Sequence, residues 1–238
     1  MGDIIKSKRP AVMRRKIALP QFGGGRENYM KILFYGDSIT DAGRARDIDV
    51  PNKQLGSGYV AYVANQLFER SLVDYDIVNR GISGNRVVDL YSRIKMDCWN
   101  HKPDVLSIHI GINDIWHEIS RENGVELDRF EKVYHMLIED TIRALPDTKI
   151  MICEPFVLPG SATEAQYERF LAVKEYAAVA KKLAEEFSLT FVPLQAAMDE
   201  AGAKYGNDVI LSDGVHPTMK GAVIFGNEWL KAFEKIEK

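Results

Sequence analysis

From residue 31 onward, short runs of β-branched and aromatic residues alternate with longer stretches whose apolar positions recur at helical spacing. The short runs predict strands at 31–35, 76–79, 105–110, 149–153 and 189–192. The longer stretches predict helices at 58–70, 87–98, 127–145, 165–187 and from 218 to about 235. Every connection between strands is long enough to hold a helix, as parallel pairing requires. The pattern therefore predicts an α/β fold, a three-layer α/β/α sandwich around a five-stranded parallel sheet in the order 2-1-3-4-5.

Residues 30–238 contain no internal repeat and no low-complexity linker, so we expect them to form one domain. Residues 1–29 precede the first strand as an N-terminal arm, in which a basic run from Lys6 to Lys16 is followed by three glycines. The arm has two interpretations of equal standing. It is either a solvated basic tail or a segment that packs on a neighbouring subunit through its interleaved apolar residues. The second interpretation fits the homo-oligomer that we expect on general grounds.

Charge, hydropathy and cysteine spacing argue against several classes of binding partner and location. Thirty-one lysines and arginines stand against 34 aspartates and glutamates, which gives a net charge of −3 and argues against a nucleic-acid binder. No apolar run reaches the length of a membrane span, and the first residues lack the apolar core of a signal peptide. The two cysteines, Cys98 and Cys153, have neither disulfide-framework nor zinc-ligand spacing. We therefore expect a cytoplasmic protein that binds neither nucleic acid nor membranes.

Polar residues follow the predicted strands, and glycines accompany them. Gly36 to Asp41 follows the first strand, Arg80 to Asn85 the second and Gly111 to Asp114 the third, while Ser212 to Pro217 precedes the last helix. Ligands of open parallel sheets bind beyond the carboxyl ends of the strands, so we expect these segments to share one rim.

Together these segments contain the groups that acyl transfer needs: a nucleophile, a base, an orienting acid and donors for an oxyanion. Ser38 sits at a strand-to-helix turn, and His216 is the candidate base, with Asp213 three residues before it to fix the imidazole. The candidate oxyanion donors are the backbone N–H groups of Ser38 and Gly84 and the side-chain amide of Asn113.

Each segment also has a plainer interpretation when taken alone. The turn at Ser38 is compatible with simple helix capping, and Gly81 and Gly84 with ordinary turn glycines. Three aspartates raise a metal alternative, because carboxylates gathered at strand ends can hold a divalent ion. They are Asp37, Asp41 and Asp114. The rim offers few further ligands, so we expect neither a metal nor any other cofactor.

Four sequence blocks, GDSITD, GISGN, GIND and DGVHP, resemble in order and spacing those of the GDSL-type, or SGNH, hydrolases. The resemblance runs from about Lys31 to the end of the chain and implies a flavodoxin-like fold. It makes Ser38 the nucleophile and first oxyanion donor, Gly84 and Asn113 the other donors, and His216 the base supported by Asp213. The arm at 1–29 is longer than the family core needs.

Longer strings, GDSITDAGRAR, SGYVAYV, NRGISGNRVVDL and HIGINDIW, resemble the cytoplasmic bacterial acetylxylan esterases of that superfamily. This resemblance implies a serine esterase that removes acetyl groups from small carbohydrates such as acetylated xylo-oligosaccharides through an acyl-enzyme. The alternative within the superfamily is a lysophospholipase or thioesterase that acts on longer acyl chains. A non-catalytic carbohydrate-binding module on the same scaffold is the alternative from another class.

Two further residues are candidates for contact with the substrate. Trp116 follows Asn113 by three residues and offers an apolar wall or a surface on which a sugar ring can stack; the alternative is ordinary packing beneath the loop. Asp37 precedes the candidate nucleophile, and its alternative role is to order the loop by accepting backbone hydrogen bonds.

Overall fold

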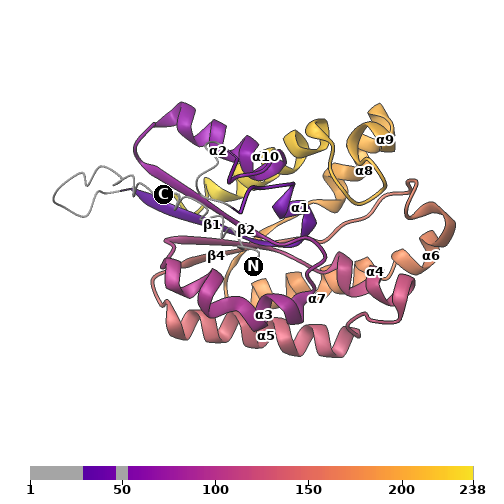
Figure 1. Ribbon diagram of the computed structural model, residues 1–238, viewed down its shortest axis with the longest axis horizontal. Coiled ribbons are helices and arrows are strands. Elements are labelled where there is room, and N and C mark those ends of the chain that lie inside the picture. The colour runs from indigo at the N-terminus through magenta and orange to yellow at the C-terminus, as the bar shows by residue number, and fades with distance from the viewer. Residues whose placement is uncertain (1–28, 47–52, 238) are drawn as a thin grey trace, which may run out of the picture.

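The structure is a computed structural model, which describes residues 29–46 and 53–237. Its strands form one parallel sheet in the order β2-β1-β3-β4-β5, which confirms the predicted fold (Figure 1). The strands are β1 (Met30–Gly36), β2 (Tyr75–Gly81), β3 (Val105–His109), β4 (Lys149–Cys153) and β5 (Thr190–Val192). The predicted arm lies outside the described residues apart from Tyr29.

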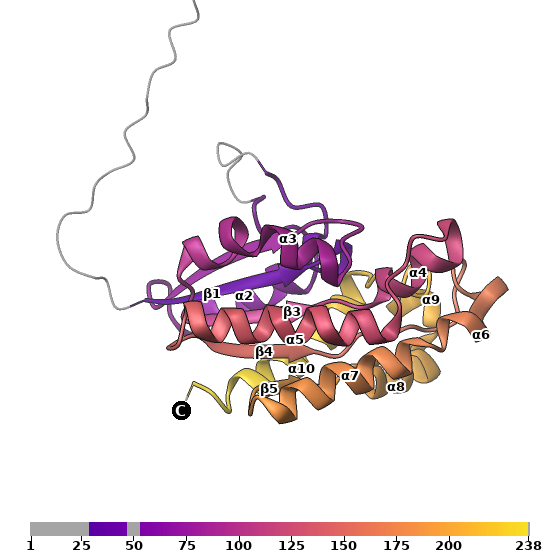
Figure 2. The same ribbon diagram turned by 90° about the horizontal axis from the view of Figure 1, so that it is seen from below.

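Helices cover both faces of the sheet. Figures 1 and 2 show α2 (Tyr59–Arg70), α8 (Gln195–Tyr205) and α10 (Met219–Phe233) on one face, and α3 (Val87–Asp97), α5 (Leu127–Ala144) and α7 (Val173–Glu186) on the other. The shorter helices α1 (Ser38–Asp41), α4 (Ile112–Arg121), α6 (Tyr167–Phe170) and α9 (Asn207–Ile210) lie toward the end of the sheet where the strands finish. Two 3₁₀ turns, η1 (Trp99–His101) and η2 (Glu164–Gln166), complete the described elements.

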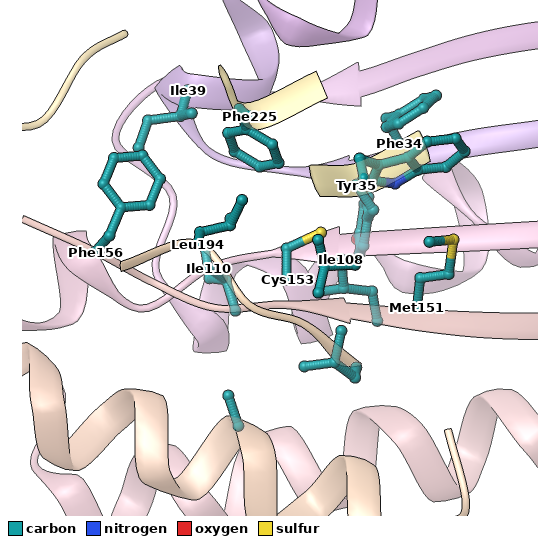
Figure 3. Packing of buried hydrophobic residues seen from close by; sticks show 14 of the residues in the cluster. Phe34, Tyr35, Ile39, Ile108, Ile110, Met151, Cys153, Phe156, Leu194 and Phe225 are labelled. Atoms are coloured by element: carbon teal, nitrogen blue, oxygen red, sulfur yellow. The ribbon is translucent and has the colours of Figure 1, made fainter. Parts of the chain in front are cut away.

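The core lies on both sides of the central strands. The side chains of Ile32 to Tyr35 in β1 are fully buried, as expected for a strand covered by helices on both faces. Figure 3 shows Phe34 and Phe225 among the packed side chains, and the Phe225 ring stacks on Tyr59 at a centroid distance of 3.8 Å. Long apolar runs in the strands are thus explained by burial on two faces.

The register of the sheet brings the carboxyl ends of its strands into line. Gly36, the last residue of β1, pairs with Gly81 of β2 and with His109 of β3, and His109 pairs with Cys153 of β4. The segments that follow these residues therefore leave the sheet side by side, which confirms the predicted rim.

The structure differs from the predicted helices in two places. The single helix expected at 165–187 is divided into η2, α6 and α7, with tight turns at Leu171 and Ala172. Neither glycine nor proline marks this break, so the sequence gives no local signal for it; the turn lets Phe170 pack edge-on against Trp116. Helices α4 and α8 were not predicted. Few apolar residues recur along α8 at helical spacing, whereas α4 has Ile112, Ile115, Trp116 and Ile119 at that spacing, so its pattern was present in the sequence but not recognised.

His109 is buried in the core, and its ring packs against those of Phe156 and Phe225. Burial lowers the pKa of His109 to about 3, so the ring is neutral.

Candidate active site

Ser38, His216 and Asp213 form a continuous hydrogen-bonded chain. The hydroxyl Oγ of Ser38 lies 2.8 Å from Nε2 of His216, and Nδ1 of the same ring lies 2.7 Å from Oδ2 of Asp213. We call these three residues the acid–base chain. An imidazole held in this way can accept a proton from the hydroxyl while the carboxylate stabilises the resulting imidazolium.

Ser38 is placed by the sharp turn from β1 into α1. Asp37 caps this short helix, with its Oδ1 accepting the N–H of Ile39 at 3.0 Å. The turn lies directly on the next strand, because a Cβ built on Gly81 would be 2.2 Å from the backbone nitrogen of Asp41. Only glycine at the end of β2 allows α1 to approach so closely.

Asp213 and His216 are placed by one short loop. The loop is closed at its base by a bridge between Leu211 and Pro217 and by the N–H of Ser212, which donates to the His216 carbonyl at 2.8 Å. Inside it, Oδ1 of Asp213 accepts the N–H groups of Val215 at 2.9 Å and His216 at 2.8 Å. The carboxylate therefore has a fixed orientation before it meets the imidazole.

Asp213 and His216 stabilise each other's charged forms, which favours an ionised carboxylate and a more basic imidazole. Partial burial opposes ionisation of Asp213, but hydrogen bonds from the His216 ring and from the two backbone N–H groups lower its pKa to about 2. The hydrogen bond to Asp213 in turn raises the pKa of His216 above its ordinary value. Asp213 is therefore charged at neutral pH, as an orienting acid should be.

A hollow of about 270 Å³ opens at this rim. Its lining residues are Ser38, Ser83, Gly84, Asn113, Trp116, His117, Arg121 and His216. The structure thus brings the candidate nucleophile, base and oxyanion donors together around one small space.

The candidate oxyanion donors are available and oriented. The backbone N–H groups of Ser38 and Gly84 meet no acceptor in the part of the chain that is described. Gly84 has φ of +80°, a conformation that favours glycine. The Asn113 amide donates to the Asn85 carbonyl at 3.1 Å through its Nδ2, which leaves one amide hydrogen for a ligand.

The two expected substrate contacts have different outcomes. Trp116 lines the hollow, with its ring centroid 5.9 Å from that of His216, so its contact with a sugar stays a prediction. Asp37 does not line the hollow and is fully buried, which leaves only the alternative role of ordering the loop. Burial raises the pKa of Asp37 to about 7, and its Oδ2 has no partner in the described structure.

Asp41 and Asp114, the other aspartates of the metal alternative, bind protein donors. Asp41 accepts the N–H and the hydroxyl of Ser83, each at 3.0 Å, and pairs with Arg46. Asp114 is buried and accepts the N–H of Val87. Within residues 29–46 and 53–237, no three histidine, cysteine or acidic side chains group as metal ligands.

Sequence reasoning missed several residues around the hollow. Its lining also includes Ser83, His117 and Arg121. His117 follows Asn113 by four residues in α4, and this helical spacing could have placed both on one face.

Arg93 was missed as well, and it lies behind the hollow. Its Nε donates to Oδ1 of Asn85 at 2.7 Å, and its two Nη atoms donate to the carbonyls of Arg80 at 2.9 Å and Gly36 at 3.1 Å. No local sequence signal identifies it.

Comparison with known proteins agrees with this geometry. The model of the GDSL-like Lipase/Acylhydrolase family matches residues 34–224. The chain is 36% identical over 207 residues to an acetylxylan esterase of Geobacillus stearothermophilus, covering 84% of this chain and 92% of that one.

Solved structures give the same result. A protein from Parabacteroides merdae assigned as a GDSL-like lipase superposes with a TM-score of 0.81 at 40% identity, covering 87% of this chain and 97% of that one. The acetylxylan esterase Axe2 from Geobacillus stearothermophilus superposes with a TM-score of 0.75 at 35% identity, covering 87% and 95%. The chain therefore belongs to the GDSL-like lipase/acylhydrolase family, and it is a carboxylic ester hydrolase.

Proposed function

We propose that this protein is a serine esterase that removes acetyl groups from small carbohydrates, such as acetylated xylo-oligosaccharides, through an acyl-enzyme. The observation that carries the proposal is the acid–base chain, whose two hydrogen bonds of 2.8 and 2.7 Å end at a hollow with unoccupied N–H donors. The similarity to an acetylxylan esterase supports the choice of substrate.

In the proposed first step, Oγ of Ser38 attacks the acetyl carbonyl carbon while Nε2 of His216 takes the hydroxyl proton. The carbonyl oxygen becomes an oxyanion, which accepts hydrogen bonds from the N–H groups of Ser38 and Gly84 and from the Asn113 amide. The intermediate collapses as the bond to the sugar oxygen breaks. His216 returns its proton to that oxygen, the sugar leaves, and an acetyl ester remains on Ser38.

In the second step, a water molecule takes the place of the sugar. Nε2 of His216 removes a proton from the water as its oxygen attacks the acetyl carbon, and the same donors stabilise the second oxyanion. The bond to Oγ then breaks and His216 protonates Ser38. Acetic acid is released, and the acid–base chain returns to its starting state.

The hollow supports a short acyl group. Its volume of about 270 Å³ must hold the acyl group and the part of the sugar next to it. Trp116, at the edge of this space, is the proposed surface for the sugar ring. The alternative, a lysophospholipase or thioesterase that acts on longer chains, requires an apolar channel beyond the lining residues.

Acetate release from an acetylated xyloside, measured beside hydrolysis of an octanoate ester, tests the proposal. Ser38→Ala is the control for both substrates, and its kcat should fall by about 10⁵-fold because the nucleophile is lost. Rapid acetate release that depends on Ser38, with little octanoate turnover, is the expected result. Preference for octanoate would support the longer-chain alternative. Hydrolysis of neither substrate, combined with tight sugar binding, would support the non-catalytic binding module instead.

The setting of the reaction is also a proposal. Cys98 and Cys153 are both free and buried, which fits the cytoplasm. No helix in the described ranges is long and apolar enough to cross a membrane. We further propose that residues 30–238 act as one domain within a homo-oligomer. Light scattering of the full chain and of a chain lacking residues 1–29 would show whether the arm contributes to assembly.

A further inference from the structure

One face of α4 extends from the proposed oxyanion hole to the outer edge of the hollow. Asn113, His117 and Arg121 are each four residues apart, and all three line the hollow. Residues at this spacing lie one above another on a helix. Since each residue rises 1.5 Å, Arg121 lies about 12 Å along the helix axis from Asn113.

Arg121 is an exposed cation to which the structure gives no protein partner. Within residues 29–46 and 53–237, it has neither an ion pair nor a hydrogen bond from its side chain. Other described exposed arginines have partners: Arg129 pairs with Glu126 at 3.2 Å, Arg143 pairs with Asp140 at 3.1 Å, and Arg169 donates to Gln166 at 2.8 Å. Arg121 therefore differs from arginines that stabilise the surface.

Among residues 29–46 and 53–237, no carboxylate in the hollow balances this charge, because none of the described lining residues is acidic. Asp89 is the acid whose charge acts on His117, and its carboxylate is already paired with Arg86 at 3.0 Å. Burial and the neighbouring positive charges of Arg121 and Arg86 lower the pKa of His117, so this ring is neutral at pH 7. The outer part of the hollow is thus positive in a chain whose net charge is −3.

The position of Arg121 in the last turn of α4 is favourable for the helix dipole. This explains a basic residue at the C-terminal end of the helix, but any lysine or arginine would serve it equally. It does not explain why the guanidinium group lines the hollow without an acidic partner.

We propose that the substrate is an acetylated oligosaccharide that carries a carboxylate, as a uronic acid does, and that Arg121 binds this carboxylate. The inference rests on the proposed function and specifies its substrate class. The acetyl group lies at Asn113, and the sugar that bears it lies over Trp116 and His117. The carboxylate lies on a neighbouring sugar, because the rise of about 12 Å along the helix axis from Asn113 to Arg121 exceeds the length of one ring. A guanidinium group can bind a carboxylate through two parallel hydrogen bonds.

The test compares two substrates that differ only in charge: an acetylated xylo-oligosaccharide with a uronic acid substituent and the same compound with that carboxylate converted to an amide. For the full-length enzyme, kcat/KM for the acid should exceed that for the amide by about fivefold at low salt, mainly through KM. The ratio should approach one in 1 M NaCl, where charges are screened within about 3 Å.

Three variants identify the residue responsible. Arg121→Gln should bring the ratio to about one, and Arg121→Lys should retain part of the preference, since the charge remains but the planar fork is lost. Arg143→Gln, which removes the same charge from α5 at a site that does not line the hollow, should keep the wild-type ratio. Equal ratios in the wild type and Arg121→Gln would overturn the inference.

Binding to the Ser38→Ala protein separates this inference from the proposed function. Calorimetry should show that the acidic oligosaccharide binds more tightly than its amide to Ser38→Ala, and equally to Ser38→Ala combined with Arg121→Gln. Such binding without any hydrolysis by the wild type would contradict the esterase while keeping the acidic ligand. Ser38-dependent hydrolysis with equal rates for both compounds would keep the esterase and overturn the role of Arg121.

Discussion

The two sides of the hollow are held in place in different ways. In the acid–base chain, the orientation of the base depends on close neighbours in sequence, because Asp213 and His216 share one loop and Asp213 accepts the backbone N–H groups of that loop. Ser38 joins this pair from 178 positions away. The opposite side, which we call the donor cluster, consists of Ser83, Gly84, Asn85 and Asn113. It depends on charged residues outside the cluster: Asp41 binds Ser83 from 42 positions away, and Arg93, eight positions after Asn85, binds the Asn85 side chain and the Gly36 carbonyl.

The two sides differ in whether the residues that react are also the residues that orient the site. In the acid–base chain, the residues that orient one another are also the residues proposed to react. In the donor cluster, the proposed donors are the Gly84 backbone N–H and the Asn113 amide, and the charged side chains of Asp41 and Arg93 hold their neighbours Ser83 and Asn85. Substitutions in the acid–base chain should therefore change the chemical step directly. Substitutions around the donor cluster should lower kcat in proportion to the contacts that they remove.

Among the substitutions that compare the two sides of the hollow, the largest effect is expected for Asp213→Asn. The amide cannot hold the His216 ring in the required tautomer or stabilise the imidazolium, so kcat should fall by about 10³- to 10⁴-fold.

The pH dependence should change as well. Asp213 raises the pKa of His216, and only neutral imidazole accepts the proton. Wild-type kcat/KM should therefore rise with pH through a pKa above the ordinary histidine value, and in Asp213→Asn this rise should move to lower pH. A pH profile of both proteins checks this, and a variant kcat within tenfold of wild type would contradict the role of Asp213.

Asn113→Ala tests the donor cluster at its proposed catalytic member. Loss of one oxyanion donor should lower kcat by about 10²- to 10³-fold with little change in KM, because the hydrogen bond strengthens only as the oxyanion forms. Steady-state kinetics on the acetylated xyloside measures both constants. Asn227→Ala on α10, which removes an exposed amide that contacts Tyr62, is the matched control and should retain wild-type kcat. Wild-type kcat in Asn113→Ala would remove this residue from the oxyanion hole.

The same division explains what the sequence could predict. The strands could be located because burial on both faces makes them short apolar runs, and the rim followed because parallel strands end together. Ser38, Asp213 and His216 were identified because each stands at a strand end or in one short loop. The sequence pattern also offered both roles of Asp37, but only burial shows that it orders the turn.

What could not be predicted depends on distant contacts. Arg93 reaches the carbonyl of Gly36 across 57 positions of the chain, and nothing near it in the sequence indicates this. The break at Leu171 and Ala172 likewise follows from tertiary packing against Trp116 and not from a local stop signal. Helix α4, in contrast, has Ile112, Ile115, Trp116 and Ile119 at helical spacing, so its continuation to Arg121 could have been predicted from the sequence.

Arg93→Lys tests whether support at a distance controls the donor cluster. A lysine keeps the positive charge but cannot bind the Asn85 side chain and the carbonyls of Arg80 and Gly36 together. We expect kcat to fall about tenfold with KM within twofold, because Asn85 in turn accepts the Asn113 amide. The pH dependence should stay at the wild-type position, since the acid–base chain is intact.

A purely structural role for Arg93 predicts a different result. Tyr35→Phe removes the bond from the tyrosine hydroxyl to the Leu90 carbonyl, 2.6 Å long, while keeping the ring beneath the Arg93 guanidinium. This variant should lose thermal stability and retain kcat when assayed well below its Tm. If Arg93→Lys also loses only stability, the donor cluster does not depend on Arg93 for its orientation.

The smallest effect is expected for Ser83→Ala, and it decides where the donor cluster ends. The hydroxyl of Ser83 donates to Asp41 at 3.0 Å, but the backbone N–H of the same residue donates to the same carboxylate oxygen at 3.0 Å and survives the substitution. The free energy of unfolding should fall by about 1 kcal/mol, and kcat/KM should stay within threefold of wild type. Ser120→Ala, which removes a hydroxyl bound to the Trp116 carbonyl outside the donor cluster, is the control. Denaturant unfolding and initial rates measure both effects. A loss of kcat as large as that of Asn113→Ala would instead mean that the Ser83 hydroxyl turns toward the hollow and donates to the oxyanion, which would place a fourth donor beside the three proposed.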